Sequence, residues 1–168
     1  MQSIDIAGRS IGVGHPVYIV AEMSANHNHD YDHAVRLIQA AKFSGADAIK
    51  LQTYTADTIT IKCGQPQFWI KDNSLWKGKN LYDLYEEAHT PWEWHPKLMK
   101  VAKDLGLDFF STPFDKTAVD FLEDLEVPLY KVASLELVDL PLLSLIAKTG
   151  KPIILSTGTS TIEEIEEA

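Results

Sequence analysis

The sequence predicts an α/β protein of the (β/α)8 TIM-barrel type, of which about the first five βα units are present, preceded by a β-hairpin. Two observations predict this fold: short apolar runs recur along the chain, and amphipathic stretches with helical spacing separate them. Apolar runs without alternation are typical of strands that are buried on both faces, as in a parallel sheet. The 168 residues are 45% hydrophobic and 23% charged, which is the composition of a globular domain.

The expected elements alternate regularly along the chain. A hairpin cap over residues 1–14 turns near Ala7 and Gly8. Five apolar runs are expected to be strands, at residues 17–23, 46–52, 107–112, 128–134 and 152–157. Helices are expected between and after them, at residues 31–44, 92–105, 116–125 and 140–148, and in a last segment that opens at Ser160 or Thr161.

Two architectures fit this order of elements: an open doubly wound sheet and a barrel that lacks its last units. The segment after the first strand reads SANHNHD, not the glycine-rich GxGxxG that a dinucleotide-binding sheet carries there. The final residues TSTIEEIEEA stop inside an expected helix without a C-cap. Both observations favour the barrel, with the whole of 1–168 as the N-terminal part of one TIM-barrel domain.

The stretch 53–91 is far longer than a normal connection between a strand and a helix. It is rich in aromatic residues and so is unlike a disordered linker. We therefore expect it to be a long active-site loop region.

Charge and cysteine content exclude several classes of protein. The net charge is -9 and no basic run occurs, so neither a nucleic-acid partner nor an anionic membrane partner is expected. The N-terminus lacks the features of a secretory signal, and the single Cys63 has no second cysteine to pair with. A reducing cytoplasm fits this cysteine usage.

Charged side chains interrupt the apolar strands near their carboxyl ends. Glu22, Lys50 and Lys131 come from three different expected strands, and a charge in such a position is costly unless it is paired or functional. In parallel α/β folds the carboxyl edge of the sheet is where active sites are built. We interpret the three as catalytic candidates, with structural ion pairing as the alternative.

Polar side chains accompany these charges at the same edge. Thr112, Ser134 and Ser156 end three strands, where they could form an anion cradle with the lysines or simply cap turns. Glu136 could reach the same pocket or face solvent. Asn26 and His27 could bind a polyhydroxylated ligand or belong to an Asx turn. His27, His29 and Asp30 match no strong metal signature, so no metal site is expected within the chain.

Several motifs together resemble the sialic acid synthase family: IVAEMSANHN, GADAIKLQTY, FFSTPFD, YKVAS and ILSTGTST. The segment LWKGKNLYDLYEEAHTPWEWHPKL resembles the pseudaminic acid synthase branch of that family. The resemblance covers nearly all of the chain. It implies a TIM barrel followed by an antifreeze-like domain in a domain-swapped homodimer. The later barrel strands, the antifreeze-like domain and the family's metal-binding histidines have no counterpart in this sequence, so the activity of the chain by itself is in question.

The resemblance also implies a reaction and roles for residues. Such enzymes condense phosphoenolpyruvate with an N-acetylated amino sugar aldehyde and water, here a 2,4-diacetamido-2,4,6-trideoxy-hexose, to give a nine-carbon keto sugar acid and phosphate. A divalent Mn or Mg ion serves as cofactor, with ligands expected mainly outside this chain. By motif, Glu22 is an acid/base or orienting group, Asn26 and His27 belong to the first-loop motif, and the others bind phosphoenolpyruvate or line its pocket: Lys50, Gln52, Thr112, Lys131, Ser134, Glu136 and Ser156.

Three other functions stay open at this point. N-acetylneuraminate or legionaminate synthesis differs from pseudaminic acid synthesis by a few contacts to the sugar. A Schiff-base aldolase could use Lys131 as its nucleophile. An inactive binding fragment would bind phosphoenolpyruvate without turnover.

Overall fold

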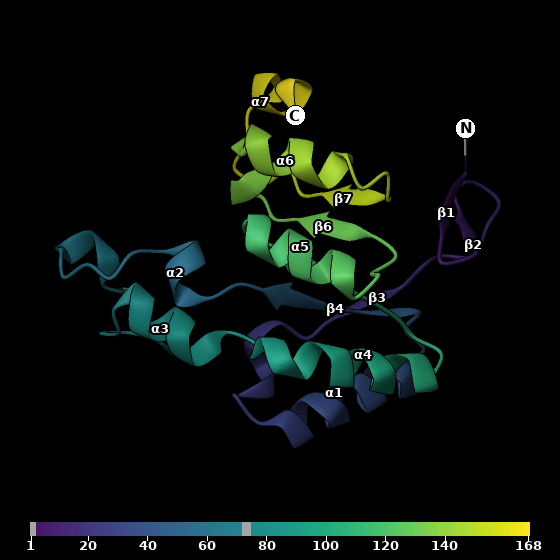
Figure 1. The fold of residues 1–168 in the computed structure, drawn as a ribbon, viewed down its shortest axis with the longest axis horizontal. Coiled ribbons are helices and arrows are strands. Elements are labelled where there is room, and N and C mark those ends of the chain that lie inside the picture. The colour runs from purple at the N-terminus through teal and green to yellow at the C-terminus, as the bar shows by residue number, and fades with distance from the viewer. Residues whose placement is uncertain (1–2, 72–74) are drawn as a thin grey trace.

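A parallel five-stranded sheet is the centre of the computed structural model, which describes residues 3–71 and 75–168 (Figure 1). Residues 1–2 of the expected hairpin cap and 72–74 of the expected loop region lie outside the described residues. The strands pair in the order of the chain: β3 (Val20–Glu22), β4 (Ala48–Thr53), β5 (Asp108–Pro113), β6 (Tyr130–Val132) and β7 (Ile153–Leu155).

This strand order decides between the two expected architectures. A doubly wound sheet reverses direction at a switch point, so its neighbouring strands are not all consecutive in the chain. Here each strand pairs with the next one, as in the first part of a barrel. The (β/α)8-type fold class is therefore confirmed, with five strands present.

Most strands are shorter than the apolar runs that predicted them, and prolines account for part of the difference. β6 begins at Tyr130 and β7 at Ile153, in each case after a proline of the expected strand, Pro128 or Pro152. Proline has no N–H to donate to a neighbouring strand, so strands tend to begin after a proline rather than to run through it.

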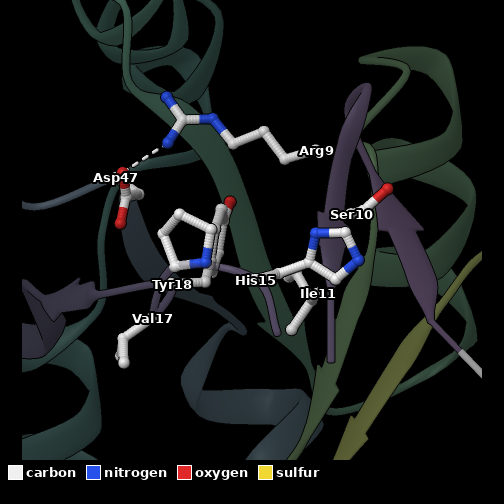
Figure 2. Close-up of a pocket in the computed structure, with 8 residues that line it drawn as sticks. Arg9, Ser10, Ile11, His15, Val17, Tyr18 and Asp47 are labelled. Atoms are coloured by element: carbon white, nitrogen blue, oxygen red, sulfur yellow. Dashed lines mark hydrogen bonds and ion pairs between the residues drawn. The ribbon is translucent and has the colours of Figure 1, made fainter. Parts of the chain in front are cut away.

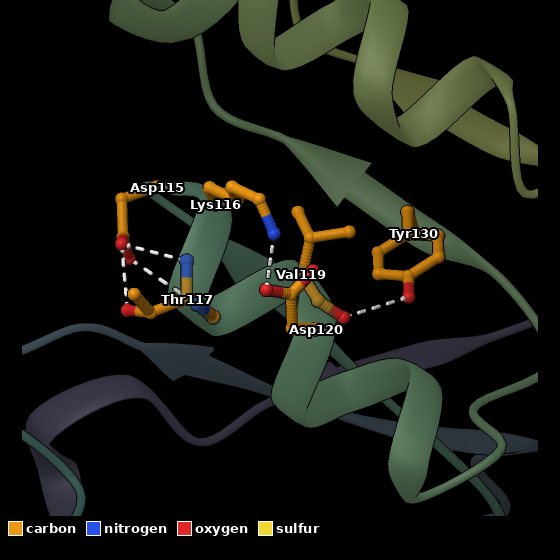
Figure 3. A network of polar contacts seen from close by, with 7 residues as sticks. Asp115, Lys116, Thr117, Val119, Asp120 and Tyr130 are labelled. Atoms are coloured by element: carbon orange, nitrogen blue, oxygen red, sulfur yellow. Dashed lines mark hydrogen bonds and ion pairs between the residues drawn. The ribbon is translucent and has the colours of Figure 1, made fainter.

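Helices cover the outer face of the sheet, and side-chain caps start most of them. α1 (Tyr31–Phe43) packs against α4 (His95–Asp104), and α5 (Lys116–Asp124) packs against α6 (Leu140–Ala147). α7 (Ile162–Glu167) opens with a capping box at Thr161. Asp115 caps α5 by accepting from the backbone N–H groups of Thr117 and Ala118 (Figure 3). The expected helices are thus present, although the expected 92–105 helix begins with a separate 3-10 turn, η3 (Trp92–Trp94).

The expected N-terminal hairpin forms from β1 (Ile4–Ile6) and β2 (Arg9–Ile11). Ala7 and Gly8 both have positive φ, 52° and 80°, which a two-residue hairpin turn requires for its twist. Arg9 forms an ion pair with Asp47, the residue before β4. This ion pair ties the hairpin to the amino end of the sheet. Figure 2 shows this contact at a cavity of about 360 Å³, also lined by Tyr18 and His15.

The stretch 53–91 is partly helical. It contains α2 (Ala56–Ile59), the 3-10 turn η2 (Pro66–Phe68) and α3 (Leu81–Ala88), which extend beyond the carboxyl end of β4 (Figure 1). Tyr54 is buried and contacts the rings of Tyr85 and Phe114, so it anchors the stretch to the segment that follows β5. Its role as an active-site loop region stays a prediction. Within the described residues, no helix is both long and apolar enough to cross a bilayer.

The strand register sorts side chains between the two faces of the sheet. Ser111 and Tyr130 lie opposite each other, and the Tyr130 hydroxyl donates to Glu123 Oε1 of α5 at 2.6 Å, so both face the helices. Figure 3 shows the Tyr130 ring directed toward α5. Because strand side chains alternate, Thr112 and Lys131 must point to the inner face. Gln52 lies opposite Thr112 in the register and shares that face.

Candidate active site

Glu22 and Lys50 form an ion pair at the carboxyl end of the sheet. They lie directly opposite each other in the register of β3 and β4, and Nζ of Lys50 contacts Oε2 of Glu22. Lys50 is buried along its length, whereas the Glu22 side chain is about half exposed. The ammonium group is therefore held at the inner face by a carboxylate that opens to solvent.

Ser24, a residue that the sequence did not single out, links this pair to Gln52. Its Oγ lies 2.8 Å from Oε1 of Glu22 and 3.0 Å from Oε1 of Gln52. Ser24 opens the turn η1 (Ser24–His27) directly after β3. Its position two residues after Glu22 was the available signal, since a hydroxyl there can reach back to a carboxylate.

Lys131 shares the electrostatic environment of this pair. Burial is the main cause that lowers the pKa of its ammonium group, and the positive charge of Lys50 lowers it further. The charges of Glu22 and Glu136 act in the opposite direction. The three charged residues predicted from the strand ends are thus brought together at the carboxyl end of the inner face of the sheet, which forms the mouth of the partial barrel.

Two buried oxygens in the described part of the chain have no hydrogen-bond partner: Oγ1 of Thr112 and Oε2 of Glu136. Thr112 is only 1% exposed. An unpartnered buried polar group costs about 1–3 kcal/mol, so each is poised to bond a ligand. Burial raises the pKa of the Glu136 carboxyl group, which favours its protonated form and hence a hydrogen-bond donor.

Ser134 and Ser156 lie at the carboxyl ends of β6 and β7. The hydroxyl of Ser134 does not cap the following turn η4 (Leu135–Val138), so it is available to the mouth. A Cβ at Gly158 would stand 3.1 Å from Oγ of Ser134, so the loop after β7 passes closely over this serine. The backbone N–H of Ser156 donates to the carbonyl of Val132 at 3.1 Å, which fixes the end of β7 beside β6.

The two first-loop candidates differ from each other. Asn26 is exposed and can meet a ligand. His27 is fully buried, with Nδ1 accepting from the backbone N–H of His29 and Nε2 lying 3.1 Å from Oγ1 of Thr90. Its ring thus has no free nitrogen for a substrate in this structure, because both nitrogens already have hydrogen-bond partners within the chain.

No group of three or more histidine, cysteine, aspartate or glutamate side chains is arranged to hold a metal ion within residues 3–71 and 75–168. Glu22 is the acidic group at the mouth that opens to solvent, and it is engaged by Lys50. The residues present do not by themselves fit the divalent ion that the family resemblance implies.

Comparison with known proteins identifies the family. Residues 37–168 match the NeuB family. The chain belongs to this family. It is 48% identical over 153 residues to a pseudaminic acid synthase of Helicobacter pylori, covering 91% of this chain and 45% of that protein. It is 37% identical over 151 residues to an N,N'-diacetyllegionaminic acid synthase of Legionella pneumophila, covering 90% of this chain and 42% of that protein.

A solved NeuB-family structure agrees with the fold. The N-acetylneuraminic acid synthetase of Leptospira borgpetersenii, in complex with citrate, superposes with a TM-score of 0.84 at 30% identity. The match covers 99% of this chain and 53% of that chain. The chain therefore spans about half the length of the relatives it matches.

Proposed function

We propose that this chain provides the phosphoenolpyruvate site of a pseudaminic acid synthase. The observation that carries the proposal is the meeting of Lys50 and Lys131 at one mouth beside the unpartnered hydroxyl of Thr112. A multiply charged anion would neutralise both ammonium groups, and the Thr112 hydroxyl would donate to one of its oxygens. Ser134 and Ser156 extend this set of donors across the next two strands.

The proposed reaction joins the two substrates by a new carbon–carbon bond. C3 of the enol phosphate attacks the aldehyde carbon of the sugar, the aldehyde oxygen takes up a proton to become a hydroxyl group, and positive charge develops at C2. Water adds to C2 and releases a proton, and the resulting hemiketal phosphate loses phosphate by cleavage of its C–O bond. Lys50 and Lys131 would hold the donor in place and stabilise negative charge on the departing phosphate.

The two carboxyl groups at the mouth suit different roles. Glu22 accepts from Lys50 and Ser24, which favours a carboxylate that orients the lysine and the incoming water. Glu136 has a buried oxygen without a partner, and burial raises the pKa of its carboxyl group, so it takes up a proton more readily than an ordinary glutamate. We assign proton transfer at the reacting carbons to Glu136, with Glu22 as the alternative.

The sugar assignment rests on the relatives. Identity is 48% to the pseudaminic acid synthase and 37% to the legionaminic acid synthase, which supports a diacetamido-trideoxy hexose of the pseudaminic type. The divalent Mn or Mg ion, which would polarise the sugar aldehyde, and the homodimer remain proposals from the resemblance.

Calorimetric titration of the purified chain with phosphoenolpyruvate tests the proposal. We expect saturable binding, and much weaker binding of pyruvate, which lacks the phosphate. Absence of phosphoenolpyruvate binding at millimolar concentration would contradict the proposal. Binding without phosphate release when sugar is added would identify this chain as a binding fragment.

One observation also favours a Schiff-base aldolase as a second candidate. The lowered pKa of Lys131 leaves more free amine at neutral pH, as a lysine nucleophile requires. Treatment with a keto acid and borohydride, followed by peptide mass spectrometry, separates the two functions. A reduced adduct on Lys131 supports the aldolase, and an unmodified Lys131 supports the synthase.

A further inference from the structure

The loop after β3 is held in an unfavourable backbone conformation. Ser24, Asn28 and His29 have positive φ angles of 44°, 51° and 54°, although none of them is glycine. Residues with a side chain rarely adopt this conformation, asparagine more readily than serine or histidine, and it persists only where the surroundings impose it. Something in the structure must therefore hold this loop, and with it the Ser24 hydroxyl that contacts Glu22 and Gln52.

His27 makes the contacts that can hold it. Nδ1 accepts a hydrogen bond of 3.0 Å from the backbone N–H of His29, so the ring proton must reside on Nε2. Nε2 then donates to Oγ1 of Thr90, 3.1 Å away. One ring nitrogen thus fixes the αL residue His29, and the other fastens the loop to the far end of the 53–91 stretch.

The surroundings leave the ring little freedom. His27 and Thr90 are both buried, at 0% and 2% exposure. The ring of Trp94 stands edge-on to His27, with centroids 5.6 Å apart, and also contacts His29 and Tyr31 on either side of the loop. Rotation of the His27 ring would therefore break both hydrogen bonds without bringing new partners within the packed layer.

We propose that His27 is a positioning residue: through its bond to Thr90 it keeps the strained loop in place, so that Ser24 holds Glu22 and Gln52 toward the bound anion. This inference rests on the proposed phosphoenolpyruvate site for its functional meaning. In this proposal His27 does not contact the substrate. It acts indirectly, by fixing the position of Ser24.

Substitutions at Thr90 give the sharpest test, because they alter the partner and leave His27 intact. Thr90→Val removes the acceptor at nearly constant volume, whereas Thr90→Ser keeps the hydroxyl. In the isotope-labelled chain we expect the side-chain amide resonances of Gln52 and the backbone resonance of Ser24 to shift in Thr90→Val and to stay in place in Thr90→Ser. We expect phosphoenolpyruvate affinity to fall by about tenfold in Thr90→Val and by less than about twofold in Thr90→Ser.

A matched control separates positioning from general stability. His95 is also fully buried, with Nε2 bonded to Thr53 and Nδ1 to the carbonyl of Pro91, but it lies on the helix-covered face. His95→Gln and His27→Gln should both lower Tm, yet only His27→Gln should shift the backbone resonance of Ser24. Unchanged Gln52 and Ser24 resonances in folded Thr90→Val would overturn the inference. If the unmodified chain binds no phosphoenolpyruvate, the proposed function fails, and the resonances still decide the role of His27.

Discussion

Lys50 and Glu22 stand opposite each other on neighbouring strands and close an ion pair at the inner face of the sheet. A second ammonium group, that of Lys131, faces the same mouth together with the half-buried carboxyl group of Glu136. In a chain whose net charge is -9, the proposed phosphoenolpyruvate site thus has two lysines at this edge of the sheet with which an anion can pair.

Replacement of Lys50 by methionine tests this local charge. Lys50→Met keeps the length of the side chain and removes its charge, so phosphoenolpyruvate affinity should fall roughly 10- to 100-fold, as expected for a lost charge-assisted contact. Calorimetric titration measures the change. Lys97→Met on the exposed face of α4 serves as control and should leave the affinity unaltered. Equal losses in both variants would mean that overall charge, not this contact, governs binding.

Two buried threonines should respond in opposite ways to loss of the hydroxyl. Thr112 Oγ1 has no partner, so Thr112→Val should leave the free energy of unfolding unchanged or raise it by up to about 1 kcal/mol while weakening phosphoenolpyruvate binding. Thr53 bonds His95 and Ser111, so Thr53→Val should lower that free energy by about 1–3 kcal/mol. Urea unfolding with and without ligand measures both effects. A clear loss of stability in Thr112→Val would indicate a missing intramolecular partner.

Stability should decline as the pH falls from about 6.5 toward 4. Burial lowers the pKa of His27 and of His95 to about 4, below the value of an unfolded histidine. The unfolded chain therefore binds more protons than the folded chain in this interval. The free energy of unfolding should fall by up to roughly 3 kcal/mol for each histidine once it is fully protonated. Urea midpoints across this pH range test the slope, and His95→Gln should reduce it. A flat profile in the unmodified chain would contradict the buried, neutral state of both rings.

Lys131 should react unusually fast with amine reagents. Its lowered pKa leaves a larger unprotonated fraction at pH 8 than an ordinary lysine has. Brief acetylation followed by peptide mass spectrometry should label Lys131 ahead of Lys50, which is paired with Glu22. Phosphoenolpyruvate should suppress the labelling of Lys131 and leave that of the exposed Lys97 unaffected. Labelling that phosphoenolpyruvate does not slow would place the ligand elsewhere.

The strands and their chemistry could be predicted from sequence because both depend on local pattern. Continuous apolar runs marked every parallel strand, and the residues that break those runs, Glu22, Lys50 and Lys131, meet at one edge. The alternation of side chains along each strand then fixes which face they share. The sequence also favoured the barrel over the doubly wound sheet, because no glycine-rich loop follows the first strand, and the consecutive strand order confirms that choice.

Contacts between residues far apart in sequence could not be predicted. The contact between the His27 ring and Thr90, for example, joins residues 63 positions apart. The helix α3 within the 53–91 stretch was not predicted either, although its signal is local: Asn80 caps it, and Leu81, Leu84 and Ala88 repeat at helical spacing. Aromatic residues dominated that stretch and obscured the helical signal.

The register of β4 also restricts how relatives can vary in length. Insertion of a single residue between Ala48 and Lys50 would turn the side chains of Lys50 and Gln52 toward the apolar core between the sheet and the helices. It would bring Leu51 and Thr53 to the mouth instead. Natural insertions and deletions should therefore gather between the strands, and a library of one-residue insertions across residues 46–60 should show a sharp boundary in tolerance where β4 ends.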